Sequence, residues 1–478
     1  MIKTEPSVIL LEFNELSPRL MDHFMAKRKL PNFSRLHREA HVYVTKAKEK
    51  SPYLEPWIQW VNVHSGLNYE DHKVFRLDEG QKLKVPCVWD ILSKEGHRVG
   101  VCGSMNVRYE TPFNGYVLPD PWSSVVEPYP ESLKTYFNFV QKNVMEHTRD
   151  RVPLSKAEYL GFLGFMLRSG LSVNTVAASI RQLLSERIRR THWKRAVILD
   201  RLQFDLFAHY WKELRPEFST FFLNSTAHFQ HMYWRNMEPE HFKMKPTAEE
   251  QAVFEEAVLF GYQEMDRLVG RFLKLCGPNT TLIFCTALGQ QPCLKYEDEG
   301  GKCFHRPKDF EKLLGVVGVT APHKVSAMMS ETFHVYFQNE ADAIATQAQL
   351  TSLRLSGEQT LNVNREKDVL TAGCCISHAV GRDAMLTGPS RAVPFFDIFY
   401  QAEGTKSGMH DSDGILWIRY PDLAHRIHSE KVALTSIAPT ILDLFQVEPP
   451  AHMKGSSLLA MGRRSSISSL GAAPVSAA

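Results

Sequence analysis

Short apolar runs alternate with longer amphipathic segments along this chain, a pattern typical of a parallel sheet covered by helices. The first run, Val-Ile-Leu-Leu at 8–11, suits a strand buried on both faces. Further strands are predicted at 41–46, 98–102, 218–223, 280–285, 332–337 and 414–419. Apolar residues at helical spacing predict helices at 18–26, 31–39, 56–64, 88–95, 247–275, 340–353 and 436–445. The pattern therefore predicts an α/β fold built around a mainly parallel sheet.

Three stretches depart from this alternation. Residues 131–215 are helical in pattern almost throughout, which predicts a helical cap or an additional helical layer. Residues 104–130 are rich in Pro, Asn and aromatic residues, as in a loop that lines a cleft. Residues 330–372 follow a strand–helix–strand pattern. They predict an inserted α+β subdomain between core segments at 1–329 and 373–462, and the Ser-, Ala- and Gly-containing tail at 463–478 is predicted to be disordered.

Composition narrows the class of protein. With 478 residues, 44% hydrophobic and 23% charged, the chain can form one large α/β domain with an insertion and cannot be disordered throughout. A net charge of +3 gives no support for nucleic-acid binding, which needs a concentrated basic face. The basic cluster at 187–190, Lys194 and Arg195 is typical of a solvated helix face and only sometimes contacts anions.

The sequence also bears on cellular location. Its first residues lack the basic stretch and long apolar run of a secretory signal, and no apolar window is long enough to span a bilayer. The eight cysteines show no Cys-x-x-Cys spacing, which argues against a zinc ribbon. These features predict a cytoplasmic protein with reduced thiols and no membrane span.

Polar residues follow several predicted strands at the point where each strand ends, namely at 12–15, 224–231, 286–291 and 408–413. In an open α/β sheet, ligands bind beyond the carboxyl ends of the strands. Asn14, His231 and His410 come from three different strand ends. We therefore expect their side chains to meet in one cleft, although a single histidine is more often structural than a ligand.

Several segments, in this order, resemble the alkaline phosphatase superfamily in its type I phosphodiesterase and nucleotide pyrophosphatase branch. The segment 55–66 resembles the helix that carries the nucleophile, and 224–234 resembles the segment with an Asp before a His. The His-Asp-Ser-Asp-Gly at 410–414 resembles the late His motif, and 437–455 the closing helix and turn. The resemblance covers about residues 7–458. It implies an alkaline-phosphatase-like sandwich and a hydrolase or transferase acting on a phosphate, phosphodiester or sulfate ester.

The departures from this family concern its metal ligands. The resemblance implies two metal ions held by Asp and His side chains and a hydroxyl nucleophile near residue 55. The positions matched to the anionic and imidazole ligands instead hold Asn14, Ala227, Ala287 and Leu288. Two adjacent divalent ions need several anionic oxygens to offset their repulsion, so a two-metal site is not expected.

Two of the family's ligand positions keep a histidine. His231 and His410 are therefore predicted to bind at most one divalent, zinc-like ion weakly, or none. With no Ser or Thr in register, Glu55 is the candidate general base or covalent nucleophile. Its alternative role is to favour the start of a helix through the macrodipole. The predicted catalytic residues are thus Asn14, Glu55, His231 and His410.

Neutral hydrogen-bonding and aromatic side chains accompany these candidates. Trp57, Asn62, Gln290 and Gln291 are predicted to bind substrate, because amides suit sugar hydroxyls or an uncharged carbonyl better than metal–phosphate chemistry. Two hypotheses follow. The first is an enzyme with an altered, metal-poor site that acts on a small-molecule or glycan ester. The second is a catalytically inactive relative that binds a ligand or a protein partner.

Overall fold

The sheet that organises the protein confirms the predicted α/β fold. A computed structural model describes residues 7–123, 125–144, 154–188, 191–328, 331–389, 391–402 and 405–459. Its main sheet has the strand order β20-β2-β19-β6-β1-β5-β3-β4, with β21 beside β2. The strands are β1 (Ser7–Phe13), β2 (His41–Lys46), β3 (Val99–Cys102), β4 (Gly115–Leu118), β5 (Phe218–Leu223), β6 (Thr280–Cys285), β19 (Asp413–Arg419), β20 (Arg426–Ile427) and β21 (Val432–Ala433). Strand β1 lies between β5 and β6 and is parallel to both, whereas β19 runs antiparallel to β2 and β6.

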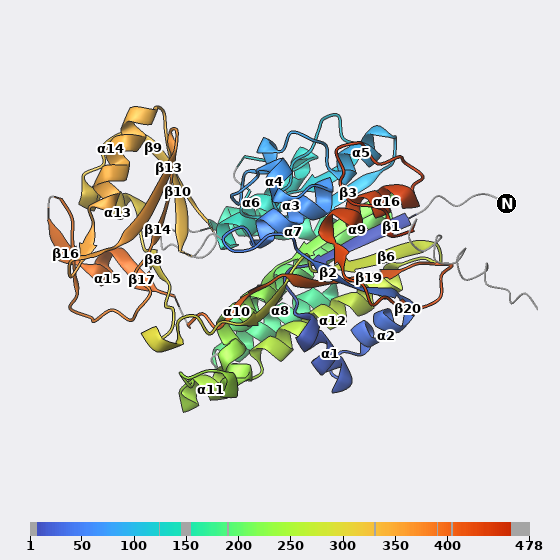
Figure 1. The fold of residues 1–478 in the computed structure, drawn as a ribbon, viewed down its shortest axis with the longest axis horizontal. Helices are drawn as coiled ribbons and strands as arrows, with labels where there is room; N and C mark the ends of the chain where they lie inside the picture. The colour runs from blue at the N-terminus through green and yellow to red at the C-terminus, as the bar shows by residue number, and fades with distance from the viewer. Residues whose placement is uncertain are drawn as a thin grey trace, which may run out of the picture.

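Helices cover both faces of this sheet (Figure 1). Side chains of β1 alternate between the faces, so Ile9 and Leu11 pack into one buried cluster, and Val8 and Leu10 into another. The helices with buried side chains in the first cluster are α1 (Pro18–Ala26), α2 (Pro31–Glu39), α6 (Lys134–Val144), α7 (Lys156–Arg168), α9 (Ala196–Leu214), α10 (Ser225–Met237) and α12 (Ala257–Leu275). Those in the second are α3 (Pro56–Ser65), α5 (Val88–Lys94) and α16 (Ile437–Leu444). This double burial explains the uninterrupted apolar sequence of β1.

The region 131–215 forms part of a helical layer on the sheet. Helix α9 packs Phe207 against Phe221 of β5, with ring centroids 5.3 Å apart. Helices α6, α7 and α8 (Val173–Glu186) precede it in the chain. Helix α9 therefore belongs to the helices that cover this face of the sheet.

Two predicted elements differ from the structure. The single helix predicted at 247–275 is divided into α11 (Ala248–Phe254), which starts at a capping box formed by Thr247 and Glu250, and α12. The predicted loop at 104–130 contains β4, the edge strand of the main sheet. This strand is only four residues long, too short for its apolar pattern to stand out.

A second structural unit with its own apolar core lies apart from the main sheet, at the left of Figure 1. Its sheets have the strand orders β13-β14-β10-β9 and β12-β11-β15-β16. The strands are β9 (His323–Ala327), β10 (Thr332–Phe337), β11 (Arg354–Leu355), β12 (Glu358–Gln359), β13 (Leu361–Glu366), β14 (Val369–Cys374), β15 (Met385–Thr387) and β16 (Ala392–Pro394), with helices α13 (Phe310–Val317), α14 (Glu340–Thr351) and α15 (Phe395–Ile398). The described part of the predicted insertion at 330–372 lies within this unit. The apolar core of the unit runs further, from Phe310 to Phe399.

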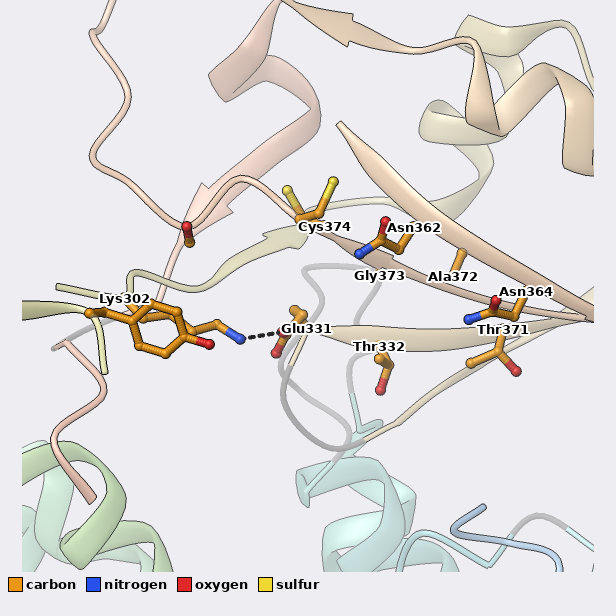
Figure 2. A pocket seen from close by; sticks show the side chains of 12 residues that line it. Lys302, Glu331, Thr332, Asn362, Asn364, Thr371, Ala372, Gly373 and Cys374 are labelled. Atoms are coloured by element: carbon orange, nitrogen blue, oxygen red, sulfur yellow. Dashed lines mark hydrogen bonds and ion pairs between the residues drawn. The ribbon is translucent and has the colours of Figure 1, made fainter. Parts of the chain in front are cut away.

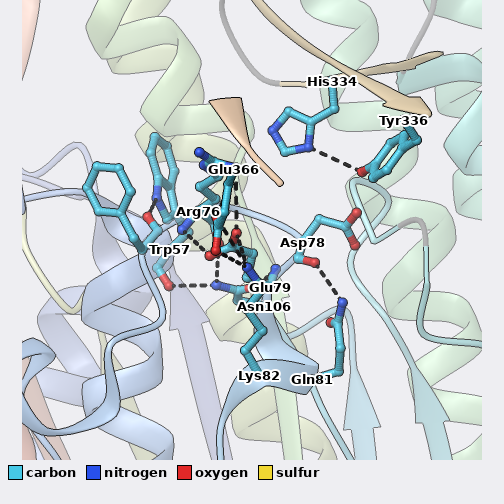
Figure 3. Close-up of polar contacts among 11 residues, drawn as sticks. Trp57, Arg76, Asp78, Glu79, Gln81, Lys82, Asn106, His334, Tyr336 and Glu366 are labelled. Carbon is cyan, nitrogen blue, oxygen red and sulfur yellow. Dashed lines mark hydrogen bonds and ion pairs between the residues drawn. The ribbon is translucent and has the colours of Figure 1, made fainter. Parts of the chain in front are cut away.

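Charged side chains join this unit to the segment that follows α4 (Tyr69–His72) (Figure 3). Glu366 of β13 lies 3.3 Å from Arg76 and 3.4 Å from Lys82, and Lys82 also contacts Glu79 at 2.9 Å. Asn106 donates hydrogen bonds to the carbonyl oxygens of Trp57 and Arg76. Exposed ion pairs contribute little individually, but this network fixes β13 beside the segment that carries Glu55 and Trp57.

The remaining elements complete the description. They are α4 (Tyr69–His72), β7 (Gly289–Pro292), β8 (His305–Pro307), β17 (Phe399–Gln401), β18 (Gly408–Asp411) and the short 3-10 turns at 80–82, 131–133, 192–195, 239–241, 297–299 and 434–436. All eight cysteines are free thiols. Among the described helices, none combines the length and apolar character required to cross a bilayer.

A buried carboxyl makes the stability of the core depend on pH. Burial raises the pKa of Asp200 in α9 to about 7, although Ser225 at the start of α10 donates a hydrogen bond to it. Because the unfolded chain ionises this group near its ordinary value, the stability it contributes is present below about pH 4 and is lost by about pH 7. As the pH rises through this window, we expect the Asp200→Asn variant to lose less unfolding free energy than the native protein. The two slopes should differ by at most about 1.4 kcal/mol per pH unit. Urea unfolding followed by tryptophan fluorescence at several pH values measures this slope, and exposed Asp383→Asn should leave it unchanged.

Candidate functional site

Glu15 lies in the turn that directly follows β1. Its backbone has φ 61°, a left-handed conformation that is uncommon outside glycine. The turn is fixed on both sides, since its N–H donates to the Thr286 carbonyl at 3.2 Å and its carbonyl accepts a hydrogen bond from the Gln230 side chain at 2.7 Å. Glu15 is almost fully buried. The strained turn thus directs a carboxylate into the protein beyond the carboxyl end of the central strand.

Two histidines meet this carboxylate. His231 lies within α10, and His410 lies on β18, which pairs with β7 in a two-stranded ribbon. The Oε2 atom of Glu15 is 3.0 Å from Nε2 of His231 and 3.3 Å from Nε2 of His410. The two imidazole ring centroids are 5.2 Å apart. The predicted convergence of His231 and His410 is therefore present, and the sequence interpretation missed Glu15 as their common partner.

Glu15, His231 and His410 form what we call the ligand cluster. Among the described residues, this is the group whose acidic and imidazole atoms could together hold a metal ion, with all ligand atoms within 4.8 Å of one another. Donor atoms bound to one zinc ion at ~2.1 Å lie no more than ~4.2 Å apart. The measured contacts of Glu15 fall within that limit. Two imidazoles and one carboxylate match the protein ligands of several catalytic zinc sites.

The hydrogen bond made by Nδ1 of His231 favours a role for this residue as a metal ligand through Nε2. Its Nδ1 atom lies 3.0 Å from the carbonyl oxygen of Gly408, so the proton is assigned to Nδ1. In the neutral ring, the Nε2 lone pair then points toward Glu15. A lone pair facing a carboxylate oxygen needs a proton or a cation between the two atoms. A backbone carbonyl that fixes the tautomer in this way is typical of metal-binding histidines.

The charges within the ligand cluster are strongly coupled. Burial alone would raise the pKa of Glu15, but the imidazoles of His410 and His231 hold it well below its usual range. Burial lowers the pKa of His231, partly opposed by Glu15. Burial also lowers the pKa of His410, but the carboxylates of Glu15 and Glu55 outweigh this effect, so the pKa is raised overall. Glu15 is consequently an anion at neutral pH, as a metal ligand must be.

Two amide side chains orient the Glu15 carboxylate. Asn14 donates to its Oε1 at 2.7 Å, and Gln290 donates to its Oε2 at 2.6 Å. The amide of Asn14 is itself held, because it donates to Asn224 at 2.7 Å and accepts a hydrogen bond from Trp60 at 2.8 Å. Asn14 therefore contacts the ligand cluster through Glu15. This position corresponds to a positioning residue, whereas the sequence analysis predicted a catalytic residue.

Glu55 approaches the ligand cluster from the start of α3. Its Oε2 lies 3.5 Å from Nδ1 of His410, and about 30% of its side chain is exposed. Although Glu55 is the residue before the first turn of α3, its side chain makes no capping hydrogen bond. Burial raises the pKa of Glu55, opposed by His410 and Lys406. The carboxyl is thus available beside the cluster.

A polar cavity of about 330 Å³ lies over the small sheet β13-β14-β10-β9 of the second unit (Figure 2). On one face of the small sheet, Thr332, Gly373 and Asn362 are neighbours across three strands, and so are His334, Thr371 and Asn364. All of these except His334 line the cavity, together with Tyr296, Lys302, Glu331, Ala372, Cys374, Cys375 and Ser377. Lys302 forms an ion pair with Glu331 at 3.0 Å.

The other predicted substrate-binding residues make contacts within the protein. The indole N–H of Trp57 donates to the Phe75 carbonyl at 2.9 Å. Asn62 is buried, donates to Glu49 at 3.0 Å and contacts His72 at 2.8 Å. Gln291 is exposed and donates to the His410 carbonyl at 3.3 Å. These bonds give Asn62 a structural role in place of the expected substrate contact, and Gln290 is likewise engaged with Glu15.

The positions that lack the family's ligands are apolar and buried. Ala227, Ala287 and Leu288 are each at most 2% exposed. The carbonyl of Ala227 accepts a hydrogen bond from Gln290 at 3.1 Å. A second ion beside the ligand cluster would therefore meet methyl and isobutyl groups at these positions. The acidic residue of β1, Glu12, bonds instead to His64 at 2.7 Å.

Comparison with known proteins gave structural similarities only. No protein-family model matches this chain. No curated protein matches its sequence. Similar solved structures include wild-type alkaline phosphatase PafA, with 12% identity over 96% of this chain and 99% of the other and a TM-score of 0.48. Murine ectonucleotide pyrophosphatase/phosphodiesterase 5 has 10% identity over 94% of this chain and 97% of the other, with a TM-score of 0.40. Phosphonoacetate hydrolase from Sinorhizobium meliloti 1021, in complex with phosphonoacetate, has 12% identity over 91% of this chain and 95% of the other, with a TM-score of 0.41.

Proposed function

We propose that this protein is a hydrolase or transferase that acts on a phosphate, phosphodiester or sulfate ester through one divalent, zinc-like ion. The observation that carries the proposal is the ligand cluster, whose three donor groups lie within 4.8 Å of one another at the carboxyl end of the central strand. The sequence resemblance supports the reaction class. Glu15 supplies the anionic ligand that the sequence appeared to lack.

The residues present fit such an ion. Glu15, His231 and His410 would hold it, and the hydrogen bonds from Asn14 and Gln290 would keep the carboxylate oriented. When bound, a divalent ion of this kind polarises an ester oxygen and lowers the pKa of water. The apolar residues Ala287 and Leu288 favour one ion over two, because they offer no ligand for a second.

Glu55 is the proposed catalytic base. Its carboxylate faces the edge of the ligand cluster, and its pKa is raised by burial toward the range in which a carboxylate accepts protons effectively. In hydrolysis, water forms a new bond to phosphorus or sulfur, Glu55 accepts the proton of that water, and the ester oxygen leaves and takes a proton from solvent. A direct attack by Glu55, with a mixed anhydride as intermediate, is the alternative use of the same carboxylate.

The non-reacting part of the substrate is proposed to occupy the polar cavity. Its lining of asparagine, threonine and serine side chains offers both donors and acceptors, which suits a group rich in hydroxyls such as a glycan. Lys406 lies close enough to influence the charges of Glu55, His231 and His410 and supplies a cation for the anionic ester. The proposed substrate is therefore a small-molecule or glycan ester.

Assays with zinc-loaded protein on aryl phosphate, aryl phosphodiester and aryl sulfate esters test the reaction class. We expect turnover of at least one class that His231→Ala abolishes. A protein that binds one metal ion but turns over none of the three, and is retained on immobilised glycans through the same cavity, would instead be the inactive binding protein. The buried alanine and leucine at the family's ligand positions are the observation that keeps this second function open.

The proposed glycan subsite gives a separate prediction. Asn364 lies beside Thr371 on the cavity face, so Asn364→Ala removes an amide that would contact substrate. We expect kcat/KM to fall about three- to tenfold for an extended substrate, the effect of one hydrogen bond, with metal content unchanged. Asn174→Ala on exposed α8 is the matched control. Equal losses in both variants, or a loss for the smallest aryl ester as well, would contradict a role in substrate binding.

A further inference from the structure

Helices α7 and α8 expose an unusual amount of apolar surface. More than half of the large apolar side chains exposed among the described residues lie between Tyr159 and Ile188. Val173 and Ile188 are 83% and 85% exposed, and Leu160 and Leu167 are 70% and 65% exposed. Contiguous exposed apolar patches usually mark interaction sites. The concentration on two consecutive helices therefore calls for a partner.

Helix α8 has its polar and apolar faces reversed relative to an ordinary surface helix. Its exposed apolar residues recur at helical spacing on one face, at Val173, Val176, Ile180, Leu183 and Leu184. The opposite face is polar and is turned toward the protein, where Gln182 donates to the Thr191 carbonyl at 2.6 Å and the buried side chain of Glu186 pairs with Arg195. A helix that uses its polar face internally leaves its apolar stripe for another surface.

Helix α7 repeats this arrangement in part. Leu160, Leu163 and Leu167 are exposed at spacings of three and four residues, so they share one face. Phe162 and Met166 on another face are buried in the core. The helix therefore anchors itself through one set of apolar residues and presents a second set to the exterior. Each of the two helices thus carries an outward apolar stripe.

Basic residues accompany these stripes. Lys156, Arg168, Arg181 and Arg187 are all exposed on or at the ends of α7 and α8. The acidic residues of the same helices are engaged in ion pairs, Glu158 with Lys142 and Glu186 with Arg195. The outward surface is therefore both apolar and cationic. It includes part of the basic cluster noted in the sequence, of which residues 189 and 190 lie outside the described residues.

We propose that α7 and α8 form a docking surface for an anionic lipid bilayer, with both helices lying in the plane of the membrane interface. Leucine, isoleucine and valine side chains would enter the boundary between head groups and acyl chains, while the arginines contact anionic head groups. The charges argue against a second copy of this chain, because its arginines would face those of the first across the contact. This attachment is peripheral, and it places the protein on a membrane surface without a spanning helix.

Co-sedimentation with vesicles of neutral phosphatidylcholine, with and without 30% anionic phosphatidylglycerol, tests this surface in the full chain. We expect binding to the anionic vesicles that falls at least tenfold in the double variant Ile180→Glu/Leu184→Glu. Arg181→Gln and Arg187→Gln should each reduce binding about fivefold, and high salt should weaken it further. Because the substituted residues are exposed, thermal unfolding should be little changed.

Ile344→Glu on α14 is the matched control, since Ile344 is 51% exposed and lies outside α7 and α8. It should bind vesicles as the native protein does. Three results would overturn the proposal: no binding of the native protein to anionic vesicles, equal binding by the double variant, or equal losses in the control. Light scattering after size exclusion identifies the competing occupant. A dimer without vesicle affinity that the double variant converts to monomer would assign the surface to a second copy.

Discussion

Replacing Glu15 by glutamine is expected to lower the affinity for zinc at least a hundredfold and to remove esterase activity at ordinary metal concentrations. Glu15 is the anionic member of the ligand cluster, and its Oε2 lies 3.0 and 3.3 Å from the two imidazoles. Glutamine keeps the shape of the side chain and removes the negative charge. The remaining neutral imidazoles would supply only two protein ligands, fewer than catalytic zinc usually takes. Competition with a fluorescent zinc chelator measures the affinity.

Glu12→Gln is the matched control for this substitution. Glu12 lies near the end of β1, just before the turn that carries Glu15, and is also buried, but its carboxylate bonds to His64 and takes no part in the ligand cluster. Its replacement by glutamine should leave zinc affinity within a few fold of the native value. If Glu15→Gln bound zinc as tightly as the native protein, the cluster would not be the metal site.

Glu55→Gln is expected to lower kcat by a factor of about 10² to 10⁴, the usual contribution of a general acid or base. Glu55 contacts His410 at 3.5 Å from outside the ligand cluster, so the metal content should remain at the native value. This combination of lost turnover and retained metal separates Glu55 from the ligands. The measurement is steady-state kinetics on zinc-loaded protein together with metal analysis of the same sample.

Glu70→Gln, an exposed change shortly after α3, controls for altered charge near this segment and should retain full activity. Turnover in the presence of hydroxylamine distinguishes the two roles of Glu55. Mass spectrometry of the peptide containing Glu55 should show no adduct if the carboxylate acts as a base, and a hydroxamate, formed from the mixed anhydride with release of phosphate or sulfate, if it attacks the substrate. Full activity of Glu55→Gln would rule out both.

The sheet was predictable because its central strand is buried on both faces. Strand β1 therefore has an uninterrupted apolar sequence, and the alternation of strands and helices follows from the same burial. Helix α3 was equally clear, since Pro56 begins it and Gly66, with φ 67°, ends it. Strand β4 and the boundary between α11 and α12 were missed because short elements carry little periodic signal.

The ligand at the end of β1 could not be assigned from spacing alone. The family resemblance pointed to residue 14, but the left-handed turn at Glu15 directs the next side chain toward the histidines. Non-glycine residues adopt this conformation rarely, so the sequence carried no local signal for it. The one indication in the sequence was that an acidic residue, Glu15, directly follows Asn14, the position at which the resemblance implies an acidic ligand.

Long-range hydrogen bonds also lay beyond the sequence. Asn62 and Gln290 were expected to face substrate, yet Asn62 bonds to Glu49 and His72, and Gln290 bonds to Glu15, which is distant in sequence. For α8, the helical pattern of residues 131–215 does not say which face of the helix turns toward the protein. The apolar face is outward because the polar face finds partners in the segment that follows the helix.

Counting the metal ions per chain tests the central claim most directly. Protein loaded with zinc, exchanged into metal-free buffer and measured by inductively coupled plasma mass spectrometry should hold one equivalent. The Glu15→Gln and His231→Ala variants should hold well below one equivalent, while Glu12→Gln should match the native protein. Two equivalents in the native protein, or one equivalent retained in both ligand variants, would contradict a single ion bound by Glu15, His231 and His410.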